Sequence, residues 1–214
     1  MVENSALSQA VIEGQYEKIA QLTNDVLGSG TKPNDIISEI LQPAMDVVGE
    51  RFSSGQYFLP DMLKAGRAMN NAMEVIKPLL INIGVPTLGK VVLGTVKGDV
   101  HDIGKNMVGM FLKGVGFEVF DLGVDVPDEK FVEAVRERKP DILGISALLT
   151  TTMPSIGTIV KALEAAGLRS DVKVIVGGAS VSQDYADSSG ADAYGRDAGS
   201  SARVCKQIIG KGAK

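Results

Sequence analysis

The only histidine of the 214-residue chain, His101, lies in a glycine-flanked stretch, GTVKGDVHDIGKN, together with Asp99 and Gly104. An imidazole presented from a loop can act as a metal ligand, as an acid or base, or as a hydrogen-bonding surface group. A metal-bound histidine usually has its second ring nitrogen held by a carboxylate, and Asp99 is well placed for that role. Gly104 removes a Cβ where the loop turns into a helix. Taken alone, the pattern also fits an incidental loop histidine.

The chain offers few other ligands for a metal. It has one histidine and one cysteine, Cys205, so it cannot assemble a structural zinc site or an internal disulfide. A metal bound by His101 would have to arrive with its other ligands attached, as in a macrocyclic cofactor. We expect Cys205 to be a small buried side chain.

Composition narrows the class of protein. A formal net charge of −4 argues against nucleic acid as a partner, because that needs clustered Lys and Arg. No segment approaches the roughly 20 apolar residues that span a bilayer, so no membrane partner is expected. The N-terminus lacks the basic and apolar regions of a secretory signal, and the default prediction is a cytoplasmic protein.

Residues 1–86 contain helical patterns only. Apolar side chains recur at spacings of three and four in residues 6–30, 33–55 and 57–80. A fourth helix is expected from a break inside these runs, near Pro43. The pattern predicts a small helical bundle.

Residues 87–214 alternate between strand and helix patterns. Predicted strands cover 90–96, 117–123, 141–148, 173–179 and 191–195, and predicted helices cover 104–115, 128–138, 153–166, 181–188 and 197–209. Five β–α units with largely apolar strands predict an α/β fold, a Rossmann-like or flavodoxin-like domain around a five-stranded parallel sheet. Ligands of such sheets bind beyond the carboxyl ends of the strands, where GDVHDIG, SALLTTT and GGAS all fall.

Three separated motifs in the second part, with a fourth in the helical part, carry a family resemblance. They are GDVHDIG (98–104), SAL (146–148) and GG (177–178), with FLPDML at 58–63. The chain resembles the cobalamin-binding module of methionine synthase over essentially its whole length. It is more similar still to the free-standing corrinoid proteins of bacterial and archaeal methyltransferase systems. The resemblance implies a helical cap domain, 1–86, and a cobalamin-binding domain, 87–214.

The resemblance also assigns roles beneath the corrin. His101 would replace the cofactor's own benzimidazole as the lower ligand of cobalt, and Asp99 would hydrogen-bond the imidazole. Thr152 matches the hydroxyl residue that completes the relay, although the methionine synthase module has Ser there. The other cofactor contacts implied in these two loops are Gly98, Val100, Asp102, Gly104 and Leu148.

Further contacts are implied for the nucleotide tail and for the upper face of the corrin. Ser146 and Thr150 would contact the tail, Gly177 and Gly178 would leave it room, and Ala198 would offer a backbone contact. Three apolar residues of the cap would cover the upper face: Phe52, Leu59 and Met62. The cap would have to swing aside for substrates, with residues 82–89 as the expected hinge.

The implied function is that of a methyl carrier with cobalamin or a related corrinoid, as methylcobalamin. One substrate-specific methyltransferase would load the methyl group, and a second, of the methyltetrahydrofolate type, would remove it. His101 would bind cobalt in the methylated state and release it in the Co(I) state, while Asp99 takes or holds a proton. A reductive activator would rescue oxidised cobalt, and no activity is expected of the chain alone.

Three alternatives share part of the pattern. A cobalamin-dependent sensor would use the same cap and sheet, but usually carries a DNA-binding or signalling domain. The cobalamin domain of a radical mutase shares D-x-H-x-x-G but lacks the helical cap. A flavodoxin-like nucleotide-binding domain without cobalt is disfavoured, because no G-x-G-x-x-G follows the first strand.

Overall fold

The computed structural model describes residues 5–80 and 87–212. The chain divides into two compact units, Met1–Thr87 with Lys113–Gly116, and Leu88–Leu112 with Phe117–Lys214. The predicted hinge, residues 82–89, lies largely outside the described residues, as does the predicted boundary at 86. No helix within the described ranges is both long enough and apolar enough to cross a bilayer.

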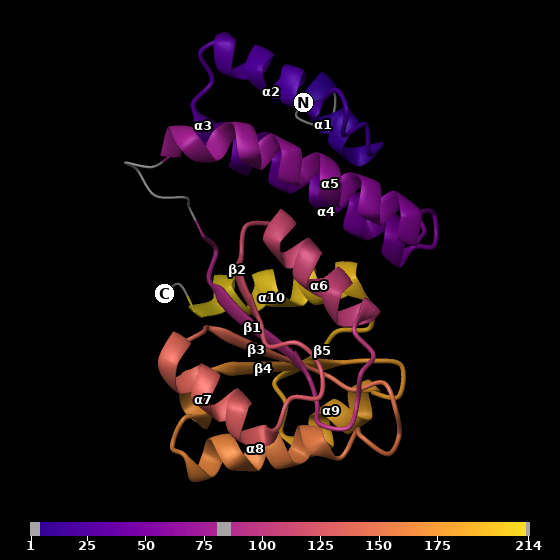
Figure 1. Ribbon diagram of the computed structural model, residues 1–214, viewed down its shortest axis with the longest axis vertical. Helices are drawn as coiled ribbons and strands as arrows, with labels where there is room; N and C mark the ends of the chain where they lie inside the picture. The colour runs from indigo at the N-terminus through magenta and orange to yellow at the C-terminus, as the bar shows by residue number, and fades with distance from the viewer. Residues whose placement is uncertain (1–4, 81–86, 213–214) are drawn as a thin grey trace. The chain divides into compact units, whose positions relative to one another are not determined.

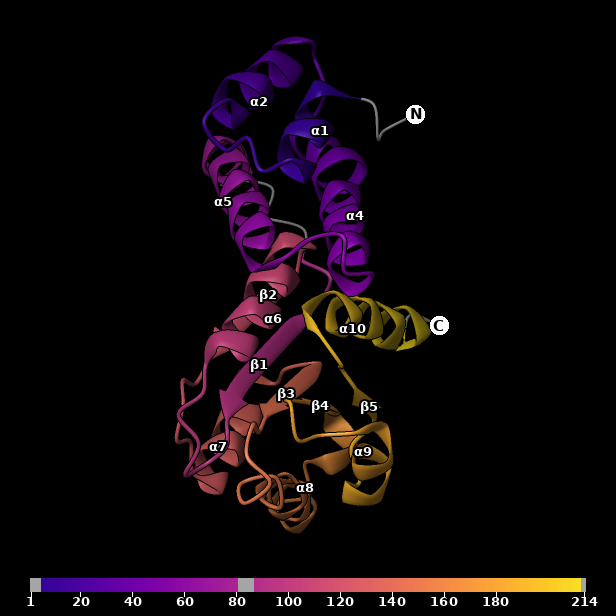
Figure 2. The same cartoon turned by 90° about the vertical axis from the view of Figure 1, so that its right-hand side faces the viewer.

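The first unit is the predicted bundle of helices (Figure 1). In chain order it contains α1 (Ala6–Ile12), α2 (Ile19–Gly28), α3 (Pro33–Asp35), the π-helical segment η2 (Ile36–Leu41), α4 (Gln42–Ser53), α5 (Leu59–Ile76) and the 3-10 turn η3 (Lys77–Leu80). Helix α2 packs on α5, and α1 packs on both α4 and α5 (Figure 2). The start of α5 is fixed by Asp61, whose carboxylate accepts the backbone N–H of Phe58 at 2.9 Å.

The break predicted near Pro43 is wrong. The chain stays helical through residues 33–53, with the π-helical segment immediately before Pro43. In this wider turn the N–H of Gln42 donates to the carbonyl of Ile37, five residues earlier. Proline has no N–H to give to an α-helical ladder, and a local π turn accommodates that loss without ending the helix.

The first apolar run breaks instead at Gly14. Residues 13–18 separate α1 from α2, and Gly14 has a φ of +67°. A Cβ at this position would lie 2.4 Å from the Cβ of Lys64 on α5. Only glycine combines this backbone conformation with so close an approach to a neighbouring helix.

The second unit is a five-stranded sheet, all of whose strands run parallel, which confirms the predicted fold class. Its elements are β1 (Lys90–Thr95), α6 (Ile103–Gly114), β2 (Glu118–Asp121), α7 (Asp128–Arg138), β3 (Ile142–Ser146), α8 (Ser155–Ala165), the 3-10 turn η4 (Arg169–Asp171), β4 (Lys173–Gly177), α9 (Gln183–Ser189), β5 (Ala193–Tyr194) and α10 (Ala198–Gly212). Helices α7, α8 and α9 cover one face of the sheet, and α6 and α10 cover the other (Figures 1 and 2). The buried residues of the core between the sheet and α7–α9 are aliphatic apart from Phe131. Cys205 on α10 is fully buried, as expected.

The strand order is β2-β1-β3-β4-β5, the flavodoxin-like order. The chain leaves β1 toward β2 on one side and later returns to place β3 on the other side. The ends of β1 and β3 therefore form the topological switch point of the sheet, where ligands of such folds bind. The pairing of Thr95 with Ser146 puts the loops that follow these two strands next to each other.

Candidate functional site

The loop from β1 to α6 holds the chain's only imidazole against a buried carboxylate. Nδ1 of His101 lies 2.8 Å from Oδ1 of Asp99, and the same oxygen accepts the backbone N–H of His101 at 3.1 Å. The Asp99 side chain is fully buried, whereas the His101 side chain is 48% exposed. A carboxylate is an acceptor, so the neutral ring carries its proton on Nδ1 and leaves Nε2 with a lone pair. Nε2 has no hydrogen-bond partner within residues 5–80 and 87–212.

The second oxygen of Asp99 is held by the loop after β3. Oδ2 accepts the N–H of Leu148 at 2.7 Å, the N–H of Leu149 at 3.4 Å and the hydroxyl of Thr152 at 2.8 Å. The structure thus brings together Asp99, His101 and Thr152, the three residues singled out for the relay. Since the two loops flank the switch point, the fold itself assembles this chain of hydrogen bonds.

The Asp99 carboxyl is held in its ionised form. Burial alone would raise its pKa, but the N–H of Leu148, the ring and backbone N–H of His101 and the hydroxyl of Thr152 all donate to the charged form. These bonds outweigh desolvation and keep the pKa of Asp99 well below its usual range. A fixed negative charge therefore lies behind the imidazole and makes Nε2 a better electron-pair donor.

Exposed apolar side chains gather on the loops around the imidazole. They follow three neighbouring strands: Val100 and Ile103 after β1, Val124 after β2, and Leu148 and Leu149 after β3. Val100 is 68% exposed and Ile103 is 66% exposed. Five large apolar side chains at one sheet edge are costly to leave in water and suit the flat apolar body of a macrocycle. We name these five side chains the apolar ring; the predicted cofactor contacts included Val100 and Leu148 but not the other three.

The glycines expected to make room for a ligand fall into two groups. A Cβ on Gly178 would lie 1.9 Å from the carbonyl oxygen of Ala147, and one on Gly177 would lie 2.8 Å from that of Gly195. The chain's own packing therefore requires both glycines. At Gly104, by contrast, a Cβ would meet no atom within 4 Å, so packing within the chain does not require glycine there.

The other predicted contacts lie at the same edge of the sheet. Ser146 ends β3 and is half-buried, Thr150 is exposed in the next loop, and Ala198 is buried at the start of α10. Gly98 has a φ of +79°, which favours glycine. Exposed Asp102 accepts the side-chain amide of Asn106 at 2.9 Å.

The three apolar residues predicted to face the corrin belong to the helical unit and differ in accessibility. Phe52 on α4 is half-buried, and Leu59 at the start of α5 is 37% exposed. Met62, one turn further along α5, is fully buried. Their contact with a corrin stays a prediction.

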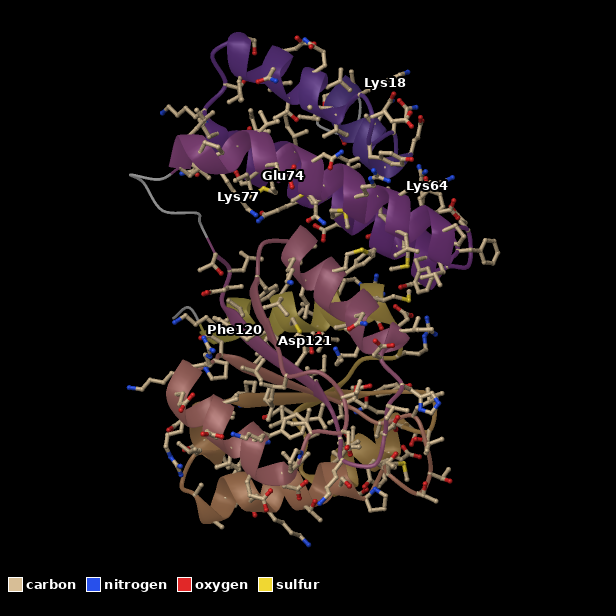
Figure 3. The ribbon with its side chains drawn as sticks, viewed as in Figure 1. Lys18, Lys64, Glu74, Lys77, Phe120 and Asp121 are labelled. Atoms are coloured by element: carbon tan, nitrogen blue, oxygen red, sulfur yellow. The ribbon has the colours of Figure 1, made fainter. Side chains whose placement is uncertain are left out.

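Two polar residues that support the loop were not evident from the sequence. The hydroxyl of Thr95 donates to the carbonyl oxygen of His101 at 3.2 Å. Buried Lys105 on α6 donates to Oδ1 of Asp121 at 2.7 Å and to the side-chain oxygen of Asn106 at 2.7 Å. Asp121, at the end of β2, is labelled in Figure 3. Neither contact follows from a motif: the first depends on how the loop after β1 folds back on its own strand, and the second on β2 lying beside β1.

Within the described residues no group of three or more His, Cys, Asp or Glu side chains could hold a bare metal ion. The residues present fit a metal that brings its own equatorial ligands. They supply one imidazole with an open Nε2, a buried carboxylate behind it and the apolar ring around it. Open space at Gly104 is consistent with the approach of a bulky group.

Comparisons with known proteins agree with this chemistry. Residues 89–203 match a family described as a B12 binding domain, and residues 4–77 match a second family with the same description. Trimethylamine corrinoid protein 1 of Methanosarcina acetivorans is 46% identical over 191 residues, 88% of each chain.

Two solved structures are also similar over most of their length. A cobalamin-binding protein from Desulfitobacterium hafniense is 37% identical with a TM-score of 0.82, covering 97% of this chain and 99% of the other. A chain of the methanol:cobalamin methyltransferase complex from Methanosarcina barkeri is 32% identical with a TM-score of 0.84, covering 95% and 78%. The chain therefore belongs to the B12-binding corrinoid proteins, and its cofactor is cobalamin or a related corrinoid with its cobalt.

Proposed function

We propose that this chain is a methyl carrier, which receives a methyl group on the cobalt of its corrinoid from one methyltransferase and delivers it to a second. The bound cobalt supplies the methyl-transfer chemistry, and the protein supplies binding, orientation and electrostatics. The observation that carries the proposal is the half-exposed His101 imidazole, whose Nδ1 is fixed 2.8 Å from a buried, ionised Asp99.

In this proposal His101 offers Nε2 as the lower ligand of cobalt. Asp99 keeps the proton on Nδ1, so the imidazole would offer the Nε2 lone pair as a strong ligand. Thr152 and the N–H of Leu148 hold the Asp99 carboxylate in position.

The remaining contacts complete the proposed cofactor site. The apolar ring would face the corrin, Ser146, Thr150 and the backbone of Ala198 would contact the nucleotide tail, and Gly177 and Gly178 would leave it room. Phe52, Leu59 and Met62 would cover the upper face of the corrin, and Met62, which is fully buried here, would have to become accessible. An apolar covering with no nucleophile protects the reactive metal from side reactions.

We further propose the partners. The 46% identity to a trimethylamine corrinoid protein, against 32% to the chain from the methanol complex, makes a methylated amine the donor to test first. The second partner would be a methyltransferase with tetrahydrofolate or another one-carbon acceptor, and a reductive activator would restore oxidised cobalt. The cytoplasmic location stays a prediction.

The ligand assignment is tested with methylcobalamin bound to the wild type and to His101→Ala. We expect the wild type to show the absorbance of histidine-coordinated methylcobalamin at neutral pH, and His101→Ala to show that of cobalt without a nitrogen lower ligand. Lys161→Ala, an exposed change on α8, is the control and should match the wild type. Identical spectra for wild type and His101→Ala would contradict the assignment.

The carrier role needs a separate measurement. The reduced holo-protein is mixed with a trimethylamine-specific or a methanol-specific methyltransferase and the matching substrate, and the cobalt spectrum is followed. Methylation with either enzyme, followed by demethylation on adding an acceptor methyltransferase, is the expected result. A corrinoid that stays unmethylated with both enzymes would count against the carrier role.

A further inference from the structure

The loop after β2 is bound by main-chain hydrogen bonds to the end of β1, where the histidine loop begins. The N–H of Thr95 donates to the carbonyl of Gly123, and the N–H of Val126 donates to the carbonyl of Thr95, each at 3.0 Å. These bonds extend the pairing of β1 with β2 beyond the ends of the strands. The loop of residues 122–127 is therefore a fixed support beside His101.

Asp125 makes two further bonds from this loop. Its Oδ1 accepts the N–H of Gly98 at 2.7 Å, and its own N–H donates to the carbonyl of Asp99 at 2.9 Å. The two bonds bracket the residue pair Gly98–Asp99. They fix the stretch of backbone from which the Asp99 side chain extends.

The backbone of Asp125 is itself unusual. Its φ is +54°, and the only other non-glycine residue with positive φ in residues 5–80 and 87–212 is Lys139. Lys139 caps the end of α7, where a left-handed residue is common. Asp125 ends no helix, so its strained conformation needs another explanation, and strain of this kind clusters at ligand sites. Its two bonds to the histidine loop provide one.

We propose that Asp125 is a positioning residue of the corrinoid site, which acts through the Asp99 backbone to keep the Asp99 carboxylate on Nδ1 of His101. The inference rests on the proposed function. The side chain of Asp99 is anchored by the loop after β3, through Leu148 and Thr152, and its backbone is anchored by the loop after β2, through Asp125. With both anchors in place, Oδ1 has little freedom to leave the imidazole.

The single histidine makes a direct test feasible, because every imidazole ¹⁵N signal of the protein belongs to His101. Asp125→Gly removes the carboxylate but keeps the backbone N–H and the left-handed conformation. In the protein without corrinoid, the ratio of Nδ1–H to Nε2–H tautomer should fall about fivefold, the scale of one lost hydrogen bond. After loading with methylcobalamin, the histidine-coordinated fraction should fall as well.

Two variants separate positioning from general stability. Asp125→Asn keeps an acceptor oxygen and a residue type that tolerates positive φ, so its tautomer ratio should return to the wild-type value. Lys139→Gly relieves the same kind of strain away from the loop and should leave the ratio unchanged.

Hydrogen exchange of the Gly98 N–H is the second measurement. The amide should be protected in the wild type and in Asp125→Asn, and unprotected in Asp125→Gly. The proposal is overturned by an unprotected Gly98 amide in the wild type, or by an Asp125→Gly protein that keeps the wild-type tautomer ratio. Both measurements use protein without corrinoid, so a failure to coordinate cobalt would count against the proposed function and not against the role of Asp125.

Discussion

At the scale of single residues, the site depends on a carboxylate that is buried and yet ionised. Asp99 accepts hydrogen bonds from two neighbouring loops, and these bonds outweigh the cost of its burial. The D-x-H-x-x-G motif was enough to predict the pair of Asp99 and His101. Asp125 could not be predicted in the same way, because its contacts cross between loops and leave no spacing in the sequence.

Replacement of Asp99 by Asn should loosen the imidazole. An amide has one acceptor oxygen, whereas Asp99 receives donors on both of its oxygens, so one donor would face the amide N–H₂. Loss of such a partner behind a metal-bound histidine typically costs about 10–100-fold in affinity for the metal. The histidine-coordinated fraction of bound methylcobalamin measures the effect, with the exposed Asp171→Asn variant as the control.

The wild type and Asp99→Asn also test whether Asp99 is ionised in the folded protein, through the pH dependence of their stability. The pKa of Asp99 is lower in the folded protein than in the unfolded chain, so the folded state holds its proton less tightly. This contribution to stability is complete above about pH 4 and is lost as the pH falls from there toward the depressed pKa. The difference in free energy of unfolding between wild type and Asp99→Asn should therefore be constant near neutrality and shrink in acid. A difference that grows in acid would contradict an ionised Asp99.

At the scale of elements, apolar periodicity predicted which segments are helices and strands, but not every break between them. Pro43 lies inside a continuous helix because the preceding π turn absorbs its missing N–H. Gly14 forms the break because α5 lies so close to it that a side chain at this position would clash with the helix. The first fact depends on local backbone geometry and the second on tertiary packing, and neither has a signature in the spacing of apolar residues.

The sequence also did not predict which strands are neighbours in the sheet. Five β–α units predict a parallel sheet but leave the order of its strands open. The order places β2 beside β1, and the loop after β2 thereby contributes Val124 and Asp125 to a site otherwise built on two predicted loops.

Two glycines at this edge should respond differently to replacement by alanine. Gly178→Ala puts a Cβ on the carbonyl of Ala147 at a φ of +127° and should lower the free energy of unfolding by about 2 kcal/mol or more. Gly104→Ala meets no atom of the chain, and it should leave stability unchanged or raise it by up to about 1 kcal/mol, because it lies in the first turn of α6. Its corrinoid affinity should fall nevertheless. Denaturant unfolding and corrinoid titration of both variants give the comparison, and equal stability losses would contradict it.

At the scale of the whole molecule, one unit holds the imidazole and the contacts that support it. The pair of Asp99 and His101, their anchors and the apolar ring all belong to Leu88–Leu112 and Phe117–Lys214. Since a ligand stabilises the state that binds it, the corrinoid should stabilise this unit first.

Added methylcobalamin should therefore raise the unfolding temperature of the chain in a concentration-dependent way. At 100 times the dissociation constant the stabilisation is about 2.7 kcal/mol. The increase should be smaller for His101→Ala at the same ligand concentration. Calorimetry of both proteins with and without ligand measures it, and an unchanged unfolding temperature for the wild type would show that the folded chain does not bind the cofactor.

If the chain carries a methyl group on cobalt, as proposed, the position of Cys205 has a consequence for that electrophilic cargo. A thiolate is the side chain most readily alkylated, and the chain has a single thiol. Burial in α10 excludes solvent from this sulfur and raises the pKa of the Cys205 thiol to about 12, so it stays protonated at physiological pH. In the proposed role, the single buried thiol would therefore not compete for the methyl group, and the cargo would not be lost to irreversible methylation at sulfur.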